Sequence, residues 1–370
     1  MSTFLVTVVL LSLAPQPAAS TEAEAEPFRP ARAGWRFQFP RDHGSHPEFQ
    51  TEWWYFTGHL TAASGRRYGF ELTFFRVGVD PADPPAQTRW GLRHLALAHF
   101  ALTDLDRREF RFYEKLNRLS PFTADAAEGE LDVFNEGWSA RAQEDGSWRI
   151  RADADGDAID LVLRAAKPPA IHGIDGVSVK GAAEGAASHY YSMPRLLAEG
   201  SIAARGRSES CRGQAWMDHE FSTSFLGQDQ AGWDWFSLQF DDGTELMLYQ
   251  MRLDDGSIDP HSSGSFIETD GSVRPLTRGE FAIDPVGRWR SPRSDATYPM
   301  GWDIAVPSLG IRARVDPELR DQELVTTSST GVTYWEGAVR ASGSRHGNPL
   351  DGLGYVEMTG YAAPFRMGPN

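Results

Sequence analysis

The sequence predicts an all-β protein whose antiparallel strands form two domains. Its 370 residues are more than one hydrophobic core usually serves, so two domains are expected. Short runs of aromatic and β-branched residues alternate with turn residues along most of the chain, as in sheets with hairpin connections. Several of these runs flank Asp-Gly turns, the strongest local signal for a β-hairpin. Many short strands joined in this way indicate antiparallel sandwiches or barrels.

The expected strands are bounded by Gly, Asp, Asn and Pro. They cover residues 52–61, 67–76, 94–104, 131–134, 148–151, 158–164, 200–204, 213–216, 233–240, 245–253, 265–269, 302–304 and 333–339. Turn sequences between them include Asp155-Gly156 and Asp241-Asp242-Gly243. The segment at residues 109–119 fits a short amphipathic helix or a polar strand, and both interpretations stay open. Residues 81–85 and 181–187 are expected to be loops.

The beginning of the chain has the pattern of a secretory signal. Residues 4–13 are an apolar run of signal-sequence length, which is too short to span a bilayer. Ala18, Ala19 and Ser20 supply small residues at a cleavage site, and an acidic stretch follows. We therefore expect a signal peptide over residues 1–20 and a linker over residues 21–34. The mature chain is expected to be exported, to the periplasm or the medium, and to have no membrane span.

The mature chain is expected to form an N-terminal barrel over residues 35–222 and a C-terminal barrel over residues 223–370. An aromatic strand opens each half, Trp53-Trp54-Tyr55-Phe56 in the first and Trp233-Asp234-Trp235-Phe236 in the second. Two similar barrels would explain why both halves open on a similar strand, and a chance similarity between two strands would explain it equally. The domains could also meet at the loop of residues 181–187.

Charge and composition exclude several classes of partner. The net charge is −15, with a pI of about 5.1. Nucleic acid would require a basic face over the phosphates, and docking on anionic lipid would require a polybasic patch.

Cys211 is the single cysteine and permits no internal disulfide. The sequence lacks the nucleophile-elbow, phosphate-loop, dinucleotide-binding, zinc-protease and kinase signatures, which disfavours acyl-transfer and nucleotide-dependent enzymes.

Several histidines could in principle hold a metal. His43 and His46 flank Gly44, while His94 and His99 lie on an apolar strand. A metal site requires three or four converging ligands, and the spacing of these residues does not indicate one. We expect no metal.

The first aromatic strand places large rings next to a carboxylate. Alternate residues of a strand share a face, so Glu52 and Trp54 are expected to point one way and Trp53 and Tyr55 the other. Glu52 and Trp54 are candidates for binding a substrate. A buried Glu52 needs a partner, or its pKa rises. A core strand with Glu52 bonded to a turn or an Arg explains the pattern equally well.

The most polar aromatic segment is residues 214–221, where Asp218, His219 and Glu220 follow Trp216 and Met217. A histidine beside carboxylates is favoured as imidazolium, an acid poised near neutral pH. Asp218 and His219 are therefore candidate catalytic residues, and Trp216 is a candidate for substrate binding. Strand alternation allows Asp218 and Glu220 to cooperate but turns His219 away unless a bulge intervenes. A polar loop tied by hydrogen bonds is the alternative.

Asp234 lies between two indoles and is a third candidate catalytic residue. Trp233 and Trp235 are candidates for substrate binding, although one strand cannot point all three side chains into one cavity. Tyr249, in the strand expected over residues 245–253, is a further candidate for substrate binding. Two later clusters are interpreted first as closing strands of the second barrel: Tyr334-Trp335-Glu336-Gly337 and Tyr355-Val356-Glu357.

Four segments carry a resemblance to a known family: QTEWWYFTGHL at residues 50–60, GQAWMDHEFSTS at 213–224, GWDWFSL at 232–238 and ELMLYQMR at 245–252. They resemble the AttH family of secreted lipocalin-like proteins, whose superfamily includes the carotenoid 1,2-hydratases. The resemblance runs from about residue 37 to the C-terminus. It implies two consecutive lipocalin-like antiparallel β-barrels, with an apolar ligand expected in a chamber inside the barrels.

The resemblance to the hydratases also implies a chemistry. Those enzymes add water to an isoprenoid C=C bond without a cofactor. A carboxylic acid supplies the proton, and aromatic rings stabilise the resulting carbocation, each by ~0.5–2 kcal/mol. The hydratases pair His with Trp and Tyr with Asp. The matching residues here are His219 with Trp216, and Asp218 or Asp234 with Trp233 and Trp235. No Tyr-x-Asp pair occurs in this region.

Two classes of function remain open. As an enzyme, the chain is a cofactor-free hydratase of an isoprenoid or other unsaturated lipid, with Asp218 or Asp234 as proton donor and His219 as its partner or as water activator. As a binding protein, it is a carrier of an apolar small molecule or an accessory protein of an ABC-type transporter. A secreted hydrolase is a weaker third alternative, because no activated nucleophile stands out.

Overall fold

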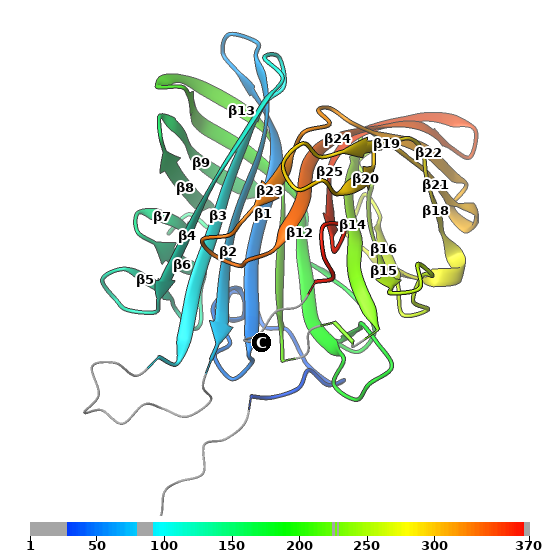
Figure 1. The fold of residues 1–370 in the computed structure, drawn as a ribbon, viewed down its shortest axis with the longest axis horizontal. Coiled ribbons are helices and arrows are strands. Elements are labelled where there is room, and N and C mark those ends of the chain that lie inside the picture. The colour runs from blue at the N-terminus through cyan, green and yellow to red at the C-terminus, as the bar shows by residue number, and fades with distance from the viewer. Residues whose placement is uncertain (1–27, 80–91, 224–225, 228, 366–370) are drawn as a thin grey trace, which may run out of the picture.

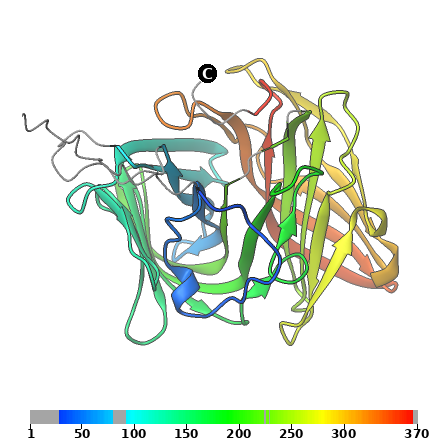
Figure 2. The same ribbon diagram turned by 90° about the horizontal axis from the view of Figure 1, so that it is seen from below.

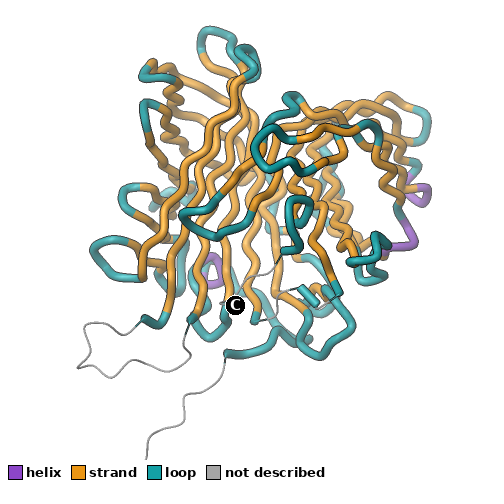
Figure 3. The backbone as a smooth tube through the Cα atoms, viewed as in Figure 1, coloured by secondary structure: helices purple, strands orange, loops and turns teal. Residues whose placement is uncertain are grey.

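The computed structural model describes residues 28–79, 92–223, 226–227 and 229–365. In this part the chain is almost entirely β, so the predicted all-β class is confirmed (Figure 3). The helical segments there are single 3-10 turns: η1 (Arg41–His43), η2 (Arg278–Glu280) and η3 (Pro307–Leu309). None of the described helices is long and apolar enough to cross a membrane. The expected signal peptide and the expected loop at residues 81–85 lie outside the described residues.

Thirteen strands form the first sheet. They are β1 (Thr51–Ala62), β2 (Arg67–Gly78), β3 (His94–Asp104), β4 (Glu109–Arg118), β5 (Ala124–Ala126), β6 (Asp132–Asn135), β7 (Trp138–Ala142), β8 (Trp148–Ala154), β9 (Asp157–Ala165), β10 (Ala170–Ile171), β11 (Ser178–Val179), β12 (Ala187–Ala204) and β13 (Arg207–Ser222). The order β4-β3-β2-β1-β13-β12-β9-β8-β7-β6-β5 brings the first and last long strands together at β1 and β13. Seen end-on in Figure 2, this sheet curls into a nearly closed barrel.

Ten strands form the second sheet. They are β14 (Gln230–Phe240), β15 (Glu245–Leu253), β16 (Ser263–Ile267), β17 (Val273–Thr277), β18 (Ala282–Pro285), β21 (Trp302–Val306), β22 (Ile311–Pro317), β23 (Glu323–Val325), β24 (Thr333–Arg345) and β25 (Asn348–Thr359). A separate hairpin joins β19 (Arg288–Arg290) and β20 (Thr297–Pro299). This second sheet is a half-barrel beside the first (Figures 1 and 2). The two sheets together fit the expected pair of lipocalin-like barrels.

The predicted turn chemistry is visible at the hairpin between β8 and β9. Asp155 and Gly156 both have positive φ, 48° and 84°. A two-residue turn with two positive φ values matches the right-handed twist of the strands that it joins. Arg205 and Gly206 repeat this geometry between β12 and β13, with φ of 53° and 76°.

The observed strands settle one open choice and correct one expectation. Residues 109–118 are strand β4, paired with β3, which settles the choice between helix and strand. The expected short strands at residues 200–204 and 213–216 are parts of the long strands β12 and β13. Cross-strand pairing continues through the polar residues 207–210, where local apolar content is low. Tertiary pairing outweighs intrinsic β-propensity there.

The three largest apolar clusters organise the molecule. The first, which includes Trp54 and Phe56, lies within the first sheet, and the second, which includes Phe236 and Trp335, lies within the second sheet. A third cluster lies between the sheets and contains Tyr55, Trp216, Trp235, Tyr249 and Tyr355. Strands β1 and β2 of the first sheet lie beside β25 and β24 of the second (Figure 1). The outer faces of the two barrels therefore share a core of their own.

Candidate functional site

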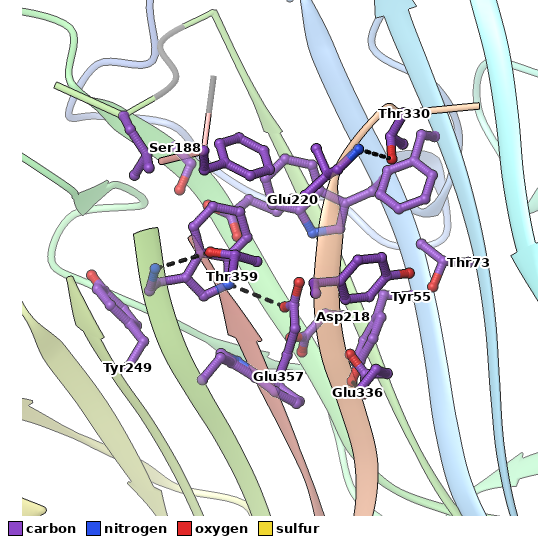
Figure 4. A pocket seen from close by; sticks show the side chains of 18 of the residues that line it. Tyr55, Thr73, Ser188, Asp218, Glu220, Tyr249, Thr330, Glu336, Glu357 and Thr359 are labelled. Atoms are coloured by element: carbon purple, nitrogen blue, oxygen red, sulfur yellow. Dashed lines mark hydrogen bonds between the residues drawn. The ribbon is translucent and has the colours of Figure 1, made fainter. Parts of the chain in front are cut away.

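A cavity of about 150 Å³ lies between the two sheets. Its walls come from β1, β2, β12 and β13 on one side and from β14, β15, β24 and β25 on the other (Figure 4). This position differs from the expected one, which is a chamber inside the barrels. Each barrel interior is filled by its own apolar core, so the space for a ligand lies where the outer faces meet.

Aromatic rings form much of the cavity wall. Trp53 and Tyr55 come from β1, Trp233 and Trp235 from β14, and Tyr249 from β15. Within β1 and within β14 these residues are two positions apart, so strand alternation points both side chains of each pair to the same face. The predicted split of β1, with Trp53 and Tyr55 opposite Glu52 and Trp54, is confirmed. Tyr55 and Trp235 meet edge-to-face across the two sheets, with ring centroids 5.2 Å apart.

Asp218 on β13 is one of the carboxyls that lie among these rings (Figure 4). It is 4% exposed. Its Oδ2 accepts a hydrogen bond from the Tyr190 hydroxyl at 2.6 Å, and its Oδ1 accepts hydrogen bonds from Trp216 Nε1 at 2.6 Å and from Ser192 Oγ. Burial raises the pKa of Asp218 to about 7, against the lowering effect of these three donors. Asp218 therefore holds an exchangeable proton near neutral pH.

Tyr190 on β12 links Asp218 to the second barrel. Its hydroxyl donates to Asp218 and accepts a hydrogen bond from Trp235 Nε1 at 3.0 Å. Burial, followed by the charge of Asp218, holds the pKa of Tyr190 well above its usual range. The Tyr–Asp pair that is missing as a sequence motif thus exists in space. It joins neighbouring strands, so its two members are 28 residues apart in the chain.

A polar chain leads away from Asp218 on the side of Ser192. His172 Nε2 lies 2.6 Å from Ser192 Oγ, and His172 Nδ1 lies 2.9 Å from Ser265 Oγ on β16. Burial lowers the pKa of His172 to about 3, so its ring is neutral and can donate through one nitrogen while accepting through the other. This arrangement fixes the orientation of the Ser192 hydroxyl that donates to Asp218.

Three further carboxyls line the cavity: Glu71 on β2, Glu336 on β24 and Glu357 on β25. Burial raises the pKa of Glu71 to about 8 and that of Glu357 to about 7. Burial, together with the charges of Glu357 and Glu71, holds the pKa of Glu336 well above its usual range. For residues 336 and 357 the sequence favoured closing strands over a site role; they lie on such strands and also line the cavity. The sequence gave no signal for Glu71.

Glu220 is the cavity carboxyl that has a cationic partner. Lys180 Nζ lies 3.2 Å from Glu220 Oε1 and 4.0 Å from the ring centroid of Tyr249. Although burial opposes the charge, Glu220 raises the pKa of Lys180. Lys180 therefore remains an ammonium that is held between a carboxylate and an aromatic ring.

His219, Glu52 and Trp54 lie on the opposite face of β13 and β1, towards the core of the first barrel. His219 Nε2 is 2.9 Å from Glu52 Oε1, and the His219 ring stacks on Trp54 with centroids 4.8 Å apart. Although burial opposes ionisation, Arg76 and the two nearby histidines, His219 and His46, hold the pKa of Glu52 well below its usual range. Glu52 is thus the ionised centre of a hydrogen-bonded network in the barrel, and none of these three candidates lines the cavity.

Within the described residues, three possible metal ligands come together in this same network. The ligand atoms of His46, Glu52 and His219 all lie within 4.8 Å of one another. The Glu52 carboxylate already accepts hydrogen bonds from Ser45 and both histidines, and its Oε2 lies 2.9 Å from Arg76 Nε. A cation there would have to compete with the Arg76 guanidinium for that carboxylate. These donors fit an ion-paired structural core better than a metal centre.

Asp234 also points away from the cavity. Its carboxylate lies 3.1 Å from Arg252 Nε and accepts hydrogen bonds from Gln250 and Tyr361. Alternation along β14 puts Asp234 on the face of Phe236, in the core of the second barrel, and puts the two tryptophans on the cavity face.

The structure therefore divides the residues that the sequence singled out. Asp218, Trp233, Trp235 and Tyr249 line the cavity, and Trp216 holds Asp218 from the same face. His219, Asp234, Glu52 and Trp54 lie elsewhere. Tyr190, Glu71, Glu336 and Glu357 were missed as site residues, because each reaches the cavity only when strands distant in sequence are brought together.

The fold and the site define a lipocalin-like protein of two barrels with an acidic, aromatic cavity between them. The model of the AttH-like family matches residues 30–361, and the chain belongs to this family.

The chain is also similar to solved structures. An AttH protein of Nitrosomonas europaea is 34% identical, with a TM-score of 0.81, and the match covers 90% of this chain and 99% of that one. Kievitone hydratase of Nectria haematococca shares the fold at 16% identity, with a TM-score of 0.68 and coverage of 92% and 97%. A search of curated proteins gave no match.

Proposed function

We propose that the protein binds an apolar, unsaturated small molecule between its barrels and adds water to one of its C=C bonds without a cofactor. The observation that carries this proposal is Asp218, a buried carboxyl with a pKa of about 7 in an aromatic cavity. A general acid works best when its pKa is close to the working pH. A structural neighbour of the same fold is named a hydratase, so water addition is a chemistry that this fold has been associated with.

The geometry supports a balanced reaction. Protonated Asp218 gives its proton to one alkene carbon, and the positive charge develops on the other carbon. The Tyr190, Ser192 and Trp216 donors then stabilise the carboxylate that is left behind. Trp233 and Trp235 face the cavity, where indole rings stabilise a carbocation by ~0.5–2 kcal/mol each. Water attacks the cation, and its surplus proton returns to the Asp218 carboxylate.

The roles differ from those considered from sequence alone. Asp218 is retained as the proton donor, with Tyr190 as the hydroxyl that orients and tunes it. Asp234 and His219 receive no role in the reaction, because neither lines the cavity. Trp233, Trp235 and Tyr249 are assigned to ligand binding.

The experiment is turnover of an acyclic carotenoid or a related polyene in deuterated water. We expect a hydroxylated product that carries deuterium on the neighbouring carbon. Asp218→Asn should lower turnover by about 10²–10⁴-fold and leave affinity for the polyene within about tenfold. The matched control is Glu323→Gln, since Glu323 is buried away from the cavity and bound by Ser291, Ser294 and Tyr298.

Two outcomes would contradict the proposal. Tight binding of a polyene with no product from any tested polyene would favour a carrier or a transporter accessory protein. Unchanged turnover in Asp218→Asn would remove the named acid from the reaction.

We also propose that the chain is exported. The support is the apolar run at residues 4–13, the small residues at 18–20 and the acidic stretch after them. N-terminal sequencing of protein recovered from a periplasmic or extracellular fraction should give a chain that starts near residue 21. A chain that starts at Met1 and stays in the cytoplasm would contradict this.

A further inference from the structure

Glu71, Glu336 and Glu357 form an acidic group in the cavity whose partners are all uncharged. Glu71 accepts from Thr73 Oγ1 at 2.5 Å, Glu336 from Tyr55 Oη at 2.6 Å and Glu357 from Trp233 Nε1 at 3.1 Å. Among the described residues, no Lys or Arg forms an ion pair with any of the three. Glu71 Oε2 and Glu336 Oε2 accept no hydrogen bond, although each residue is only 1% exposed. A buried acceptor without a donor costs about 1–3 kcal/mol. The acidic group therefore lacks a partner that would donate to these oxygens or neutralise them.

The backbone register holds two of these carboxyls against each other. Glu336 and Glu357 are directly paired residues of β24 and β25. Like charges at such positions are destabilising. A carboxyl group in this position is stabilised either by a proton or by a cation that lies between the two carboxylates.

Lys180 shows how this cavity accommodates a positive charge. Its ammonium lies 3.2 Å from Glu220 and over the ring of Tyr249. The Glu71, Glu336 and Glu357 group has the same two components, carboxylates and the aromatic rings of Tyr55 and Trp233, but no ammonium of the described chain. An ammonium that is desolvated over an aromatic face gains about 2 kcal/mol or more.

We propose that this acidic group is a subsite for an organic cation, an alkylated or protonated amine at one end of an otherwise apolar ligand. The apolar body of the ligand lies along the tryptophan wall, and its cationic nitrogen lies among Glu71, Glu336 and Glu357. This inference rests on the proposed function in that the cavity is the ligand site. When the cation enters, one carboxylic acid of the group ionises and its proton passes to solvent, so the net charge of the subsite with its ligand is unchanged.

The test uses two probes that differ in one atom type. They are para-hydroxybenzyltrimethylammonium and its carbon isostere para-neopentylphenol. Binding to the full chain at pH 7 is followed by tryptophan fluorescence and by calorimetry in two buffers of different ionisation enthalpy. We expect the ammonium probe to bind at least about tenfold more tightly and to release close to one proton, whereas the isostere releases none.

Substitutions of the cavity carboxyls test whether the ammonium probe binds among them. Glu336→Gln should weaken the ammonium probe by about tenfold and leave the isostere within about twofold, whereas Glu323→Gln should change neither. Glu71→Gln serves the same purpose if Glu336→Gln does not fold.

Each result is decisive. Equal affinity for the two probes, or cation binding without proton release, overturns the cation subsite and leaves the hydration proposal standing. Binding of neither probe overturns the cation subsite, and turnover of a polyene then decides the hydration proposal separately. Cation binding as described, with no turnover of any polyene, supports the subsite and overturns the hydratase.

Discussion

Replacing Glu71 by Gln tests whether the cavity carboxyls are protonated in the folded protein. Glu71 is 1% exposed and has one hydrogen-bond donor, Thr73. Glutamine has the shape of the protonated side chain but cannot ionise. The variant therefore imitates wild-type protein at low pH and should differ from it at high pH.

The magnitude follows from proton linkage. Burial raises the pKa of Glu71 from 4.5 to about 8, so between these pH values the folded chain binds a proton that the unfolded chain has released. The contribution of Glu71 to the free energy of unfolding therefore falls as pH rises, by about 1.4 kcal/mol per pH unit. The favourable contribution is fully present below pH 4.5 and is lost through pH 8. The total loss is at most about 5 kcal/mol.

The assay is urea unfolding at pH 5 and pH 9, followed by tryptophan fluorescence. At pH 5, Glu71→Gln should match the wild type within about 1 kcal/mol. At pH 9 it should be more stable by several kcal/mol, up to the limit of about 5 kcal/mol. Glu128→Gln, at an exposed position, should follow the wild type at both pH values. If the advantage of Glu71→Gln is the same at pH 5 and pH 9, the premise that buried carboxyls of this cavity are neutral is refuted.

Two further predictions concern the other parts of the account. Glu52→Ala should lower the free energy of unfolding by about 3–5 kcal/mol, because it leaves Arg76 buried without its carboxylate. The affinity of the cavity for the ammonium probe should stay unchanged. A loss of that affinity in a fully folded variant would give Glu52 a role at the site. The hydration rate should be constant below the pKa of Asp218, about 7, and fall about tenfold per pH unit above it; a rate that rises with pH would show that the working form of the acid is the carboxylate.

Strand alternation made part of the site predictable. Asp218 and His219 are neighbours in the chain, and the period of two already separates them onto opposite faces. The same rule separates Asp234 from Trp233 and Trp235. Alternation does not show which face meets the other barrel, because both faces are buried over residues 215–222 of β13 and along most of β14.

The position of the cavity was not predictable, for a physical reason. Tyr55 and Glu336 bond at 2.6 Å although they are 281 residues apart, and their contact exists only after the two barrels dock. Glu71 lies in a strand whose apolar pattern is that of a core, with no polar neighbour to mark it. The Tyr190–Asp218 pair likewise depends on the β12–β13 register, in which Tyr190 is directly paired with Glu220 and Asp218 lies diagonally across.

The proton on Asp218 is the claim on which the proposed chemistry depends, and infrared difference spectroscopy measures it directly. The spectrum of the wild type minus that of Asp218→Asn is recorded from pH 4 to pH 9. The account predicts a protonated-carboxyl band that is present at pH 6 and disappears with a midpoint near the pKa of about 7. A midpoint near the ordinary value of 3.8, with a carboxylate already formed at pH 6, would contradict it.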